Sequence, residues 1–171
     1  CGTVGMSAIM AARIAGCKNI IAVGGNPVSL KLAMELGATH TVNRKECKDI
    51  VGRIKEITKG GCHYAIDTSG VSDFVKKALA CVRFKGTAVV LGLTGDVTIN
   101  IQEELMGEAK SLVGVVEGDA NSKTFIPKLL EYYREGKFPV DKLIRFYDFD
   151  DINLAFEESH QGKAIKSVLR M

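Results

Sequence analysis

Residues 20–37 read IIAVGGNPVSLKLAMELG, which predicts a β-strand that passes directly into an α-helix. The run at 20–23 is short, apolar and branched, as is typical of a buried strand. The helix that follows has Asn26 at its N-cap and Pro27 at its first position, and Gly37 stands just past its end. A strand followed by a crossover helix is the building unit of a parallel sheet.

The same alternation of strands and helices continues on both sides of this unit. We expect strands at 39–43, 63–67, 87–91 and 111–116, and helices at 49–58, 72–81 and 122–134. Ser72 is the expected N-cap of its helix, and Pro127 suggests that the last helix becomes regular only near Phe125. The pattern predicts an α/β fold with a Rossmann-type doubly wound parallel sheet.

The character of the sequence changes after Pro139. A strand in IRFYDF, a helix at 150–162 and a final strand in AIKSVLRM follow without further alternation of strand and crossover helix. We therefore expect a nucleotide-binding domain in residues 1–140 and a separate C-terminal segment in residues 141–171.

Composition narrows the class of protein. The chain has 171 residues, 46% hydrophobic and 25% charged, with a formal net charge of +3, which is the composition of an ordinary globular domain. No apolar run has the length of a membrane span and no leader opens the chain, so we expect a cytoplasmic protein that does not bind a membrane. No basic run is present, so we expect no nucleic-acid partner. The five cysteines and three histidines lack ligand spacing, which predicts reduced thiols, no metal site and no catalytic residue within this chain.

The first residues carry a possible phosphate-binding turn. Gly2, Thr3, Val4 and Gly5 fit the last four places of GxGxxG, in which glycines let the backbone approach a pyrophosphate at a helix N-terminus. A plain tight turn explains two glycines three residues apart equally well. The opening CGTVGMSAIMAARIAG reads as the body of a helix, so we expect a piece of a longer protein that lacks the motif's first glycine and the strand before it.

The end of the strand at 20–23 bears on cofactor choice. An NAD-binding domain usually has an acidic residue there for the adenosine ribose, but this strand runs into Gly24 and Gly25, and no acid precedes Glu35. NADP(H) is therefore the favoured cofactor, and NAD(H) remains possible. Three side chains could contact a 2′-phosphate: Arg44, Asn26 and Ser29. The alternative is a flexible glycine turn beside a solvated Arg44.

Taken in order, the segments YAIDTSG, GTAVVLG, LVGVVEGD and FPVDKLIRFYDFDDINLAFEESHQGKAIKSVLR resemble the C-terminal half of the zinc-containing medium-chain alcohol dehydrogenases. Within that superfamily the chain is most similar to the aryl-alcohol (benzyl alcohol) dehydrogenase group. The resemblance implies hydride transfer between an alcohol, aromatic or allylic, and a nicotinamide cofactor. It also implies that zinc and the catalytic residues belong to the N-terminal half, so that the fragment is inactive by itself.

The resemblance further implies a role for particular residues. Residues 2–5 match the pyrophosphate turn, and Gly24 falls where most members have the acidic ribose ligand. The remaining matches are Thr68, Ser69 and Gly70 on the adenosine side, Leu91, Gly92, Leu93, Val115 and Glu117 around the nicotinamide, Arg44 on the phosphate side, and Lys166 toward the diphosphate. Each position also has a structural reading, as a strand-to-helix turn, a core residue or a solvated charge.

Two other functions remain open. The segment SLVGVV at 111–116 could be an edge strand that pairs with a second copy, which predicts a homo-oligomer and, in the extreme, a non-catalytic dimerisation module. The chain could also come from a zinc-free quinone or enoyl reductase of the same superfamily. The C-terminal segment is most similar to the aryl-alcohol group, which favours the zinc enzyme.

Overall fold

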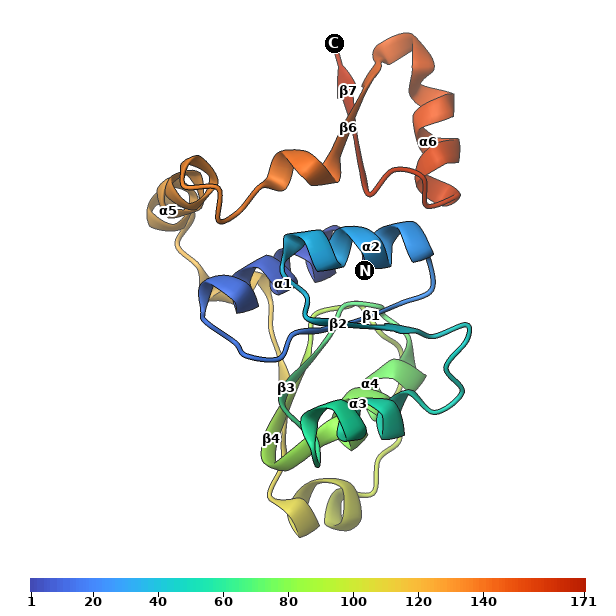
Figure 1. Cartoon of the computed structure of the whole chain (residues 1–171), viewed down its shortest axis with the longest axis vertical. Helices are drawn as coiled ribbons and strands as arrows, with labels where there is room; N and C mark the ends of the chain where they lie inside the picture. The colour runs from blue at the N-terminus through green and yellow to red at the C-terminus, as the bar shows by residue number, and fades with distance from the viewer. The chain divides into compact units, whose positions relative to one another are not determined.

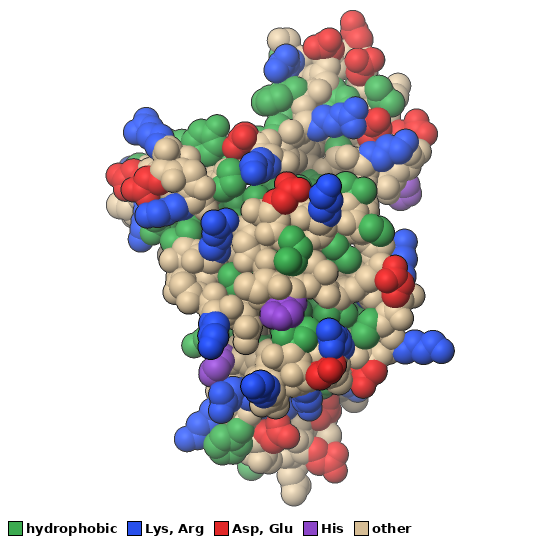
Figure 2. Space-filling model, viewed as in Figure 1, with side chains coloured by type: hydrophobic (Ala, Val, Ile, Leu, Met, Phe, Trp, Pro, Cys, Tyr) green, Lys and Arg blue, Asp and Glu red, His purple; other side chains and the backbone are tan.

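Helices alternate with short strands along most of the chain (Figure 1). The computed structural model describes residues 1–171, which divide into two units. Unit 1 contains Cys1–Thr41 together with Ser122–Met171, and unit 2 contains Val42–Asn121. None of the helices has the length and apolarity needed to cross a lipid bilayer. On the face drawn in Figure 2, side chains of both charges are interspersed.

The N-terminal part of unit 1 contains the predicted strand and helix. Its elements are α1 (Thr3–Ile14), β1 (Ile21–Gly24), α2 (Pro27–Leu36) and the first two residues of β2 (His40–Asn43), whose last two residues belong to unit 2. β1 pairs with β2. The Asn26 carboxamide oxygen accepts a hydrogen bond from the Val28 N–H at 2.9 Å, which confirms the N-cap. Gly37 ends α2 with φ +127°, a conformation that favours glycine.

Helices α1 and α2 lie side by side around an apolar core (Figure 1). A Cβ atom at Gly37 would lie 2.5 Å from the Cδ atom of Arg13 on α1, so the turn after α2 passes close to α1. The core also takes in Leu143, which lies more than a hundred residues away in sequence and is 2% exposed. Its other large buried side chains are Met6, Ile9, Met10, Ile20, Leu30 and Leu36.

The C-terminal part of unit 1 forms a small layer of its own. Its elements are α5 (Ser122–Arg134), β6 (Ile144–Asp148), α6 (Ile152–His160) and β7 (Lys166–Arg170), with β6 and β7 parallel. Tyr147 of β6 is buried with Ala155 and Ala164, and its hydroxyl donates to Glu158 at 2.6 Å. Glu158 also pairs with Arg145 at 2.9 Å. Burial and the hydrogen bond to Glu158 raise the pKa of Tyr147.

Unit 2 is a three-stranded parallel sheet with helices against it. Its main elements are α3 (Ile50–Thr58), β3 (Cys62–Asp67), α4 (Ser72–Cys81), β4 (Val82–Val90) and β5 (Ser111–Gly114). The strand order is β3-β4-β5, all parallel, which leaves β5 at an edge. Helices α3 and α4 contact each other and β3. A π-helical turn (Ile101–Leu105) and a 3-10 turn (Met106–Glu108) fill the connection between β4 and β5.

The α/β class with parallel sheets is thus as predicted, but several element bounds differ. β4 begins at Val82, five residues before the expected start, because the chain leaves α4 already extended and Val82 is buried. Ser72 is the first residue of α4 and Val71 is the N-cap; the Ser72 hydroxyl lies 3.5 Å from that of Thr94 and caps nothing.

The bounds predicted for the helix at 122–134 are confirmed, but α5 is helical from Ser122 and not only from Phe125, with Pro127 inside it. Near a helix N-terminus the missing N–H of a proline removes only one hydrogen bond. The predicted end of the strand at 111–116 is wrong. β5 ends at Gly114, because the chain then turns into a 3-10 segment in which Glu117 has φ +50°. The predicted domain boundary near residue 140 stays a prediction.

Candidate cofactor-binding site

The carboxyl ends of β3, β4 and β5 meet at one edge of the sheet, because the three strands are parallel. Open α/β sheets bind their ligands at this edge. The loop at 91–93 is fixed to β3, since the N–H groups of Leu91 and Gly92 donate to the Asp67 carbonyl at 2.9 and 3.3 Å. The Val115 N–H donates to the Val90 carbonyl at 3.0 Å. Three predicted segments, 68–70, 91–93 and 115–117, therefore follow neighbouring strand ends.

The loops at 68–70 and 91–93 touch through their glycines. A Cβ atom at Gly92 would lie 2.4 Å from the Gly70 nitrogen and 3.1 Å from the Thr68 carbonyl carbon. Gly70 has φ +70°, and a Cβ atom there would lie 2.5 Å from the Leu93 carbonyl oxygen. Both glycines are needed for the backbones to approach this closely. The sequence marked these residues as lining, but it gave no sign that the two loops contact each other.

A buried carboxylate supports the first of these loops. Asp67 is 6% exposed, and one of its oxygens accepts from the Ser69 N–H at 3.2 Å and the Ser69 hydroxyl at 2.7 Å. Its other oxygen is buried and has no hydrogen-bond partner. The Ser69 hydroxyl in turn accepts from the Val71 N–H at 3.1 Å. Ser69 is thus held by the strand end itself, with its hydroxyl directed back to Asp67.

The outer positions of this edge are exposed. Leu93 is fully exposed and Val116 is 81% exposed, so apolar side chains stand at the rim where a flat ring could contact them. Glu117 begins a left-handed turn that continues through Gly118 and Asp119. Arg44 is exposed, and its guanidinium carbon lies 5.7 Å from the centre of the Phe74 ring on α4, within the range of a cation–π contact.

In unit 1 the residues of the predicted glycine turn open α1. Gly2 is the N-cap, no side chain caps the helix, and a Cβ atom on Gly2 would have nothing within 4 Å. The Thr3 hydroxyl donates to the Ile165 carbonyl at 3.2 Å, and Val4 is 54% exposed. The first helical turn, which includes Gly5, therefore presents uncapped N–H groups beneath open space. Such a helix start suits an anionic diphosphate.

The turn after β1 is more crowded than the sequence suggested. A Cβ atom at Gly24 would lie 3.1 Å from the Leu30 side chain and 3.2 Å from the Cys1 sulfur, so packing also favours glycine here. Gly25 follows, and then Asn26. The Asn26 carboxamide is used at both ends, because its nitrogen donates to the Gly162 carbonyl at 3.0 Å while its oxygen caps α2.

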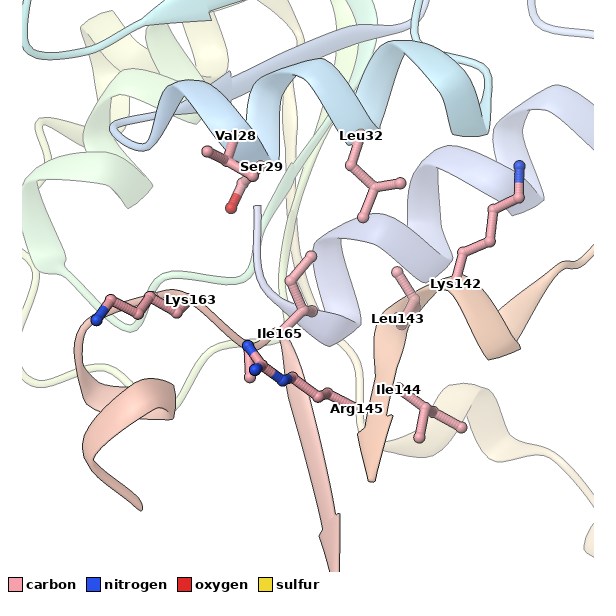
Figure 3. Close-up of a pocket in the computed structure, with 11 residues that line it drawn as sticks. Val28, Ser29, Leu32, Lys142, Leu143, Ile144, Arg145, Lys163 and Ile165 are labelled. Carbon is pink, nitrogen blue, oxygen red and sulfur yellow. The ribbon is translucent and has the colours of Figure 1, made fainter. Parts of the chain in front are cut away.

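Ser29 faces a cavity between α2 and the C-terminal segment (Figure 3). The cavity has a volume of about 140 Å³, and its lining includes Lys142, Arg145 and Lys163 but no acidic residue. Ser29 is 9% exposed, and Figure 3 shows its hydroxyl directed toward the segment that carries Lys163. Sequence reasoning missed the three cations, because they lie more than a hundred residues from Ser29. Lys166 is exposed at the start of β7 and is not part of this lining.

The structure therefore brings the predicted residues together in two sets, one in each unit. Residues 68–70, 91–93 and 115–117 share a sheet edge in unit 2, where Arg44 also lies. Residues 2–5, Gly24, Gly25, Asn26, Ser29 and Lys166 belong to unit 1. No group of three or more His, Cys, Asp or Glu side chains is arranged to hold a metal ion.

Comparison with known proteins gives a family for this arrangement. A family model described as "Zinc-binding dehydrogenase" matches residues 3–132. Geraniol dehydrogenase of Castellaniella defragrans is 38% identical over 98% of this chain and 46% of its own length. The chain therefore spans about half the length of that curated relative.

Solved structures agree over nearly the whole chain. An alcohol dehydrogenase zinc-binding domain protein from Burkholderia ambifaria is 41% identical with a TM-score of 0.94, covering 99% of this chain and 46% of its own. Benzyl alcohol dehydrogenase from Acinetobacter calcoaceticus is 38% identical with a TM-score of 0.94, covering 99% of this chain and 47% of its own. The similarity extends from α1 through the C-terminal segment.

Proposed function

Because the chain belongs to the zinc-binding dehydrogenase family, we propose that it is the cofactor-binding half of an alcohol dehydrogenase that transfers hydride between an alcohol and a nicotinamide. One observation carries this proposal: nearly all of the chain aligns with half of geraniol dehydrogenase and half of benzyl alcohol dehydrogenase. In the proposed enzyme, residues 1–140 form the nucleotide-binding domain. Residues 141–171 complete the catalytic domain.

The cofactor's parts are assigned to residues by local chemistry. The diphosphate binds at the uncapped start of α1, at residues 2–5, and Lys166 contributes a positive point charge to it. The adenosine contacts the loop at 68–70. The nicotinamide contacts residues 91–93, which follow β4, together with Val115 and Glu117. Open space above Gly2 and the exposed side chain of Leu93 support these assignments, because both leave room for a bound molecule.

The chemical step needs groups that we place outside this chain. A bound zinc ion would supply Lewis acidity that lowers the pKa of the alcohol hydroxyl, so that the alcohol loses that proton and hydride can leave from its carbinol carbon. The residues described here would bind the cofactor, orient its ring and exclude water from one side of it. We therefore propose that these 171 residues turn over no alcohol by themselves.

NADP(H) is the proposed cofactor, with NAD(H) as the alternative. A carboxylate at the end of β1 would repel a 2′-phosphate, and Gly24, Gly25 and Asn26 carry none. Ser29 and the cation Lys163 line one cavity, whose lining holds no acid, and Asn26 bonds to the neighbouring Gly162. Positive charge near this turn favours the phosphorylated cofactor. Arg44 is a further candidate contact in unit 2.

Calorimetry on the full-length protein tests the cofactor. We expect NADPH to bind at least tenfold more tightly than NADH, a difference of about 1.4 kcal/mol. Asn26→Asp keeps the helix cap, loses the hydrogen bond to the Gly162 carbonyl and adds a negative charge. The lost hydrogen bond affects both cofactors alike, whereas the charge should weaken NADPH binding more than NADH binding. Asn153→Asp, which adds the same charge on the exposed part of α6, should change neither. Tighter NADH binding by the unaltered protein would establish the NAD-linked alternative.

The proposed substrates are aromatic or allylic alcohols, supported by the names of the relatives at 38% identity. Oxidation rates of the full-length protein with benzyl alcohol, geraniol and a small diol compare the candidates. A diol is the informative control, since a butanediol dehydrogenase has a similar fold at only 27% identity. A preference for the diol would reject the proposed substrate class.

We also propose that the enzyme is a homo-oligomer joined through β5. β5 is the edge strand of its sheet, and Leu112 and Val113 are 37% and 41% exposed. An exposed edge carries unpaired main-chain donors and acceptors that a second copy can use.

A further inference from the structure

Two thiols in unit 2 take no part in the proposed cofactor site. Cys62 is the first residue of β3, and Cys81 is the last residue of α4. Their sulfur atoms are 3.7 Å apart, and the Cys62 thiol also lies 3.5 Å from the Cys81 carbonyl oxygen. Cys81 is 4% exposed, whereas Cys62 is only partly buried. Cys62 is therefore the more accessible residue of the pair, and the sulfur of the buried Cys81 lies next to its own.

The two thiols differ in acidity. The hydrogen bond from Cys81 lowers the pKa of Cys62, against a smaller opposing effect of burial. The same hydrogen bond, together with burial, raises the pKa of Cys81 well above its usual range. Cys62 is therefore the thiol that ionises first. The thiolate is the reactive form of cysteine toward oxidants, so the more exposed thiol is also the more nucleophilic one.

The backbone around Cys62 permits the sulfurs to approach each other. Cys62 precedes the regular part of the β3-β4 pairing, whose register shifts between Cys62 and Tyr64. Gly60 and Gly61 come directly before it. A Cβ atom on Gly60 would have nothing within 4 Å, whereas a Cβ atom on Gly61 would lie 2.8 Å from the Arg83 nitrogen and 3.0 Å from the Cys81 carbonyl oxygen, so the backbone before Cys62 lies directly against that of Cys81. Closing the gap from 3.7 Å to a bonding distance of about 2 Å therefore requires movement at the Cys62 end of β3, before the regular pairing that begins at Tyr64.

We propose that Cys62 and Cys81 are a peroxide-reactive pair that closes to an intramolecular disulfide. In the first step the Cys62 thiolate attacks a peroxide oxygen; the O–O bond breaks, Cys62 becomes a sulfenic acid, and the departing oxyanion takes a proton from water. In the second step the Cys81 sulfur attacks the Cys62 sulfur, the S–O bond breaks and water leaves with the Cys81 proton. The peroxide is reduced by two electrons, and the two thiols are oxidised by two.

Peptide mapping of the full-length protein tests this proposal. After treatment with hydrogen peroxide, alkylation and trypsin digestion without reductant, we expect residues 60–76 joined to residues 78–83, with two hydrogen atoms lost. Dithiothreitol should release both peptides. Cys17, which is exposed, is the internal comparison, and its peptide, residues 14–18, should remain unlinked. Oxidation confined to Cys17 and Cys47, with Cys62 and Cys81 still free to alkylate after unfolding, would overturn the proposal.

Variants separate the two steps. Cys62→Ser should abolish the linked peptide, whereas Cys17→Ser should leave its yield unchanged. Cys81→Ser removes the second thiol, so a sulfenic acid at Cys62 should accumulate and react with dimedone. If the buried Cys81→Ser variant does not fold, trapping of the Cys62 sulfenic acid by dimedone in the unaltered protein, in competition with the linked peptide, gives the same information. In the Cys62→Ser variant Cys81 should stay free to alkylate after peroxide treatment and unfolding; oxidation of Cys81 to the same extent as in the unaltered protein would disprove the pairing.

Discussion

At the sheet edge of unit 2, close contact between two loops requires glycine at two positions. Gly92 faces the backbone of Gly70 and Thr68, where a Cβ atom would have no room. Gly92→Ala should therefore separate the loops and lower the free energy of unfolding by about 1–3 kcal/mol. It should also weaken cofactor binding by the full-length protein, because both loops belong to the proposed site.

The matched control is Gly95→Ala, whose added Cβ would meet nothing within 4 Å. Urea denaturation and cofactor calorimetry on the two variants make the comparison. Equal stability of the two variants would mean that the loops at 68–70 and 91–93 do not touch as described.

A side-chain hydrogen bond between Ser69 and Asp67 stabilises the loop that follows β3. Asp67 is buried, and its shortest hydrogen bond, 2.7 Å, comes from the Ser69 hydroxyl. Ser69→Ala leaves the carboxylate with the Ser69 N–H alone, so we expect a loss of about 1–3 kcal/mol in the free energy of unfolding. Ser111→Ala, at an exposed position of β5, should change it by less than about 0.5 kcal/mol. Thermal or urea unfolding of both variants decides the matter, and similar losses would refute the role given to this bond.

These residues show what sequence alone could and could not supply. The resemblance to the medium-chain dehydrogenases implied that Ser69, Gly70 and Gly92 are cofactor contacts. Their packing was not predicted, since contact between two loops depends on the register of β3 and β4. The cations around Ser29 were missed because no local sequence pattern links residue 29 to residue 163.

Among the helices and strands, local sequence signals predicted both ends of α2 correctly, but they predicted the ends of several other elements poorly. Asn26, Pro27 and Gly37 act through their own side chains and backbone, so the sequence was enough to place that helix. The start of β4 depends on the burial of Val82 and the pairing of Cys62 with it, which are tertiary facts. The N-cap of α4 likewise fell on Val71 although Ser72 has the better capping side chain.

The edge strand β5 allows an element-scale prediction about assembly. The Val115 N–H points toward β4, and N–H directions alternate along a strand, so the Leu112 N–H points away from the sheet. Leu112→Pro should remove an outward donor and shift the full-length protein toward monomer with little loss of stability. Val113→Pro should instead break the pairing with β4 and cost about 1–3 kcal/mol.

Sedimentation velocity and urea unfolding of the two proline variants give the answer. Unchanged self-association in the Leu112→Pro variant would remove β5 from the proposed interface. A monomeric unaltered protein would reject the homo-oligomer itself.

At the scale of the whole chain, the parallel α/β class followed from strand and helix periodicity, but the grouping of the segments did not. The sequence separates the C-terminal segment from the rest because its pattern changes after Pro139. In the structure, residues from both ends of the chain share unit 1, where the Thr3 hydroxyl donates to Ile165 and Leu143 enters the core around α1 and α2. Periodicity reports which face of an element is apolar, and it does not report which distant element covers that face.

Shared burial in unit 1 predicts that its two sequence segments unfold together. Leu143→Ala empties a fully buried position beside α1 and α2, so it should lower the free energy of unfolding by about 2–5 kcal/mol. Leu154→Ala removes the same atoms from a half-exposed position on α6 and should cost much less.

Hydrogen exchange on the full-length protein then distinguishes a shared core from an independent appendage. If Leu143→Ala lowers protection in α1 and α2 as well as in β6 and β7, the two segments form one cooperative structure, because the loss at residue 143 is felt more than a hundred residues away. Lower protection confined to residues 141–171 would show instead that the C-terminal segment folds on its own and only rests on the core.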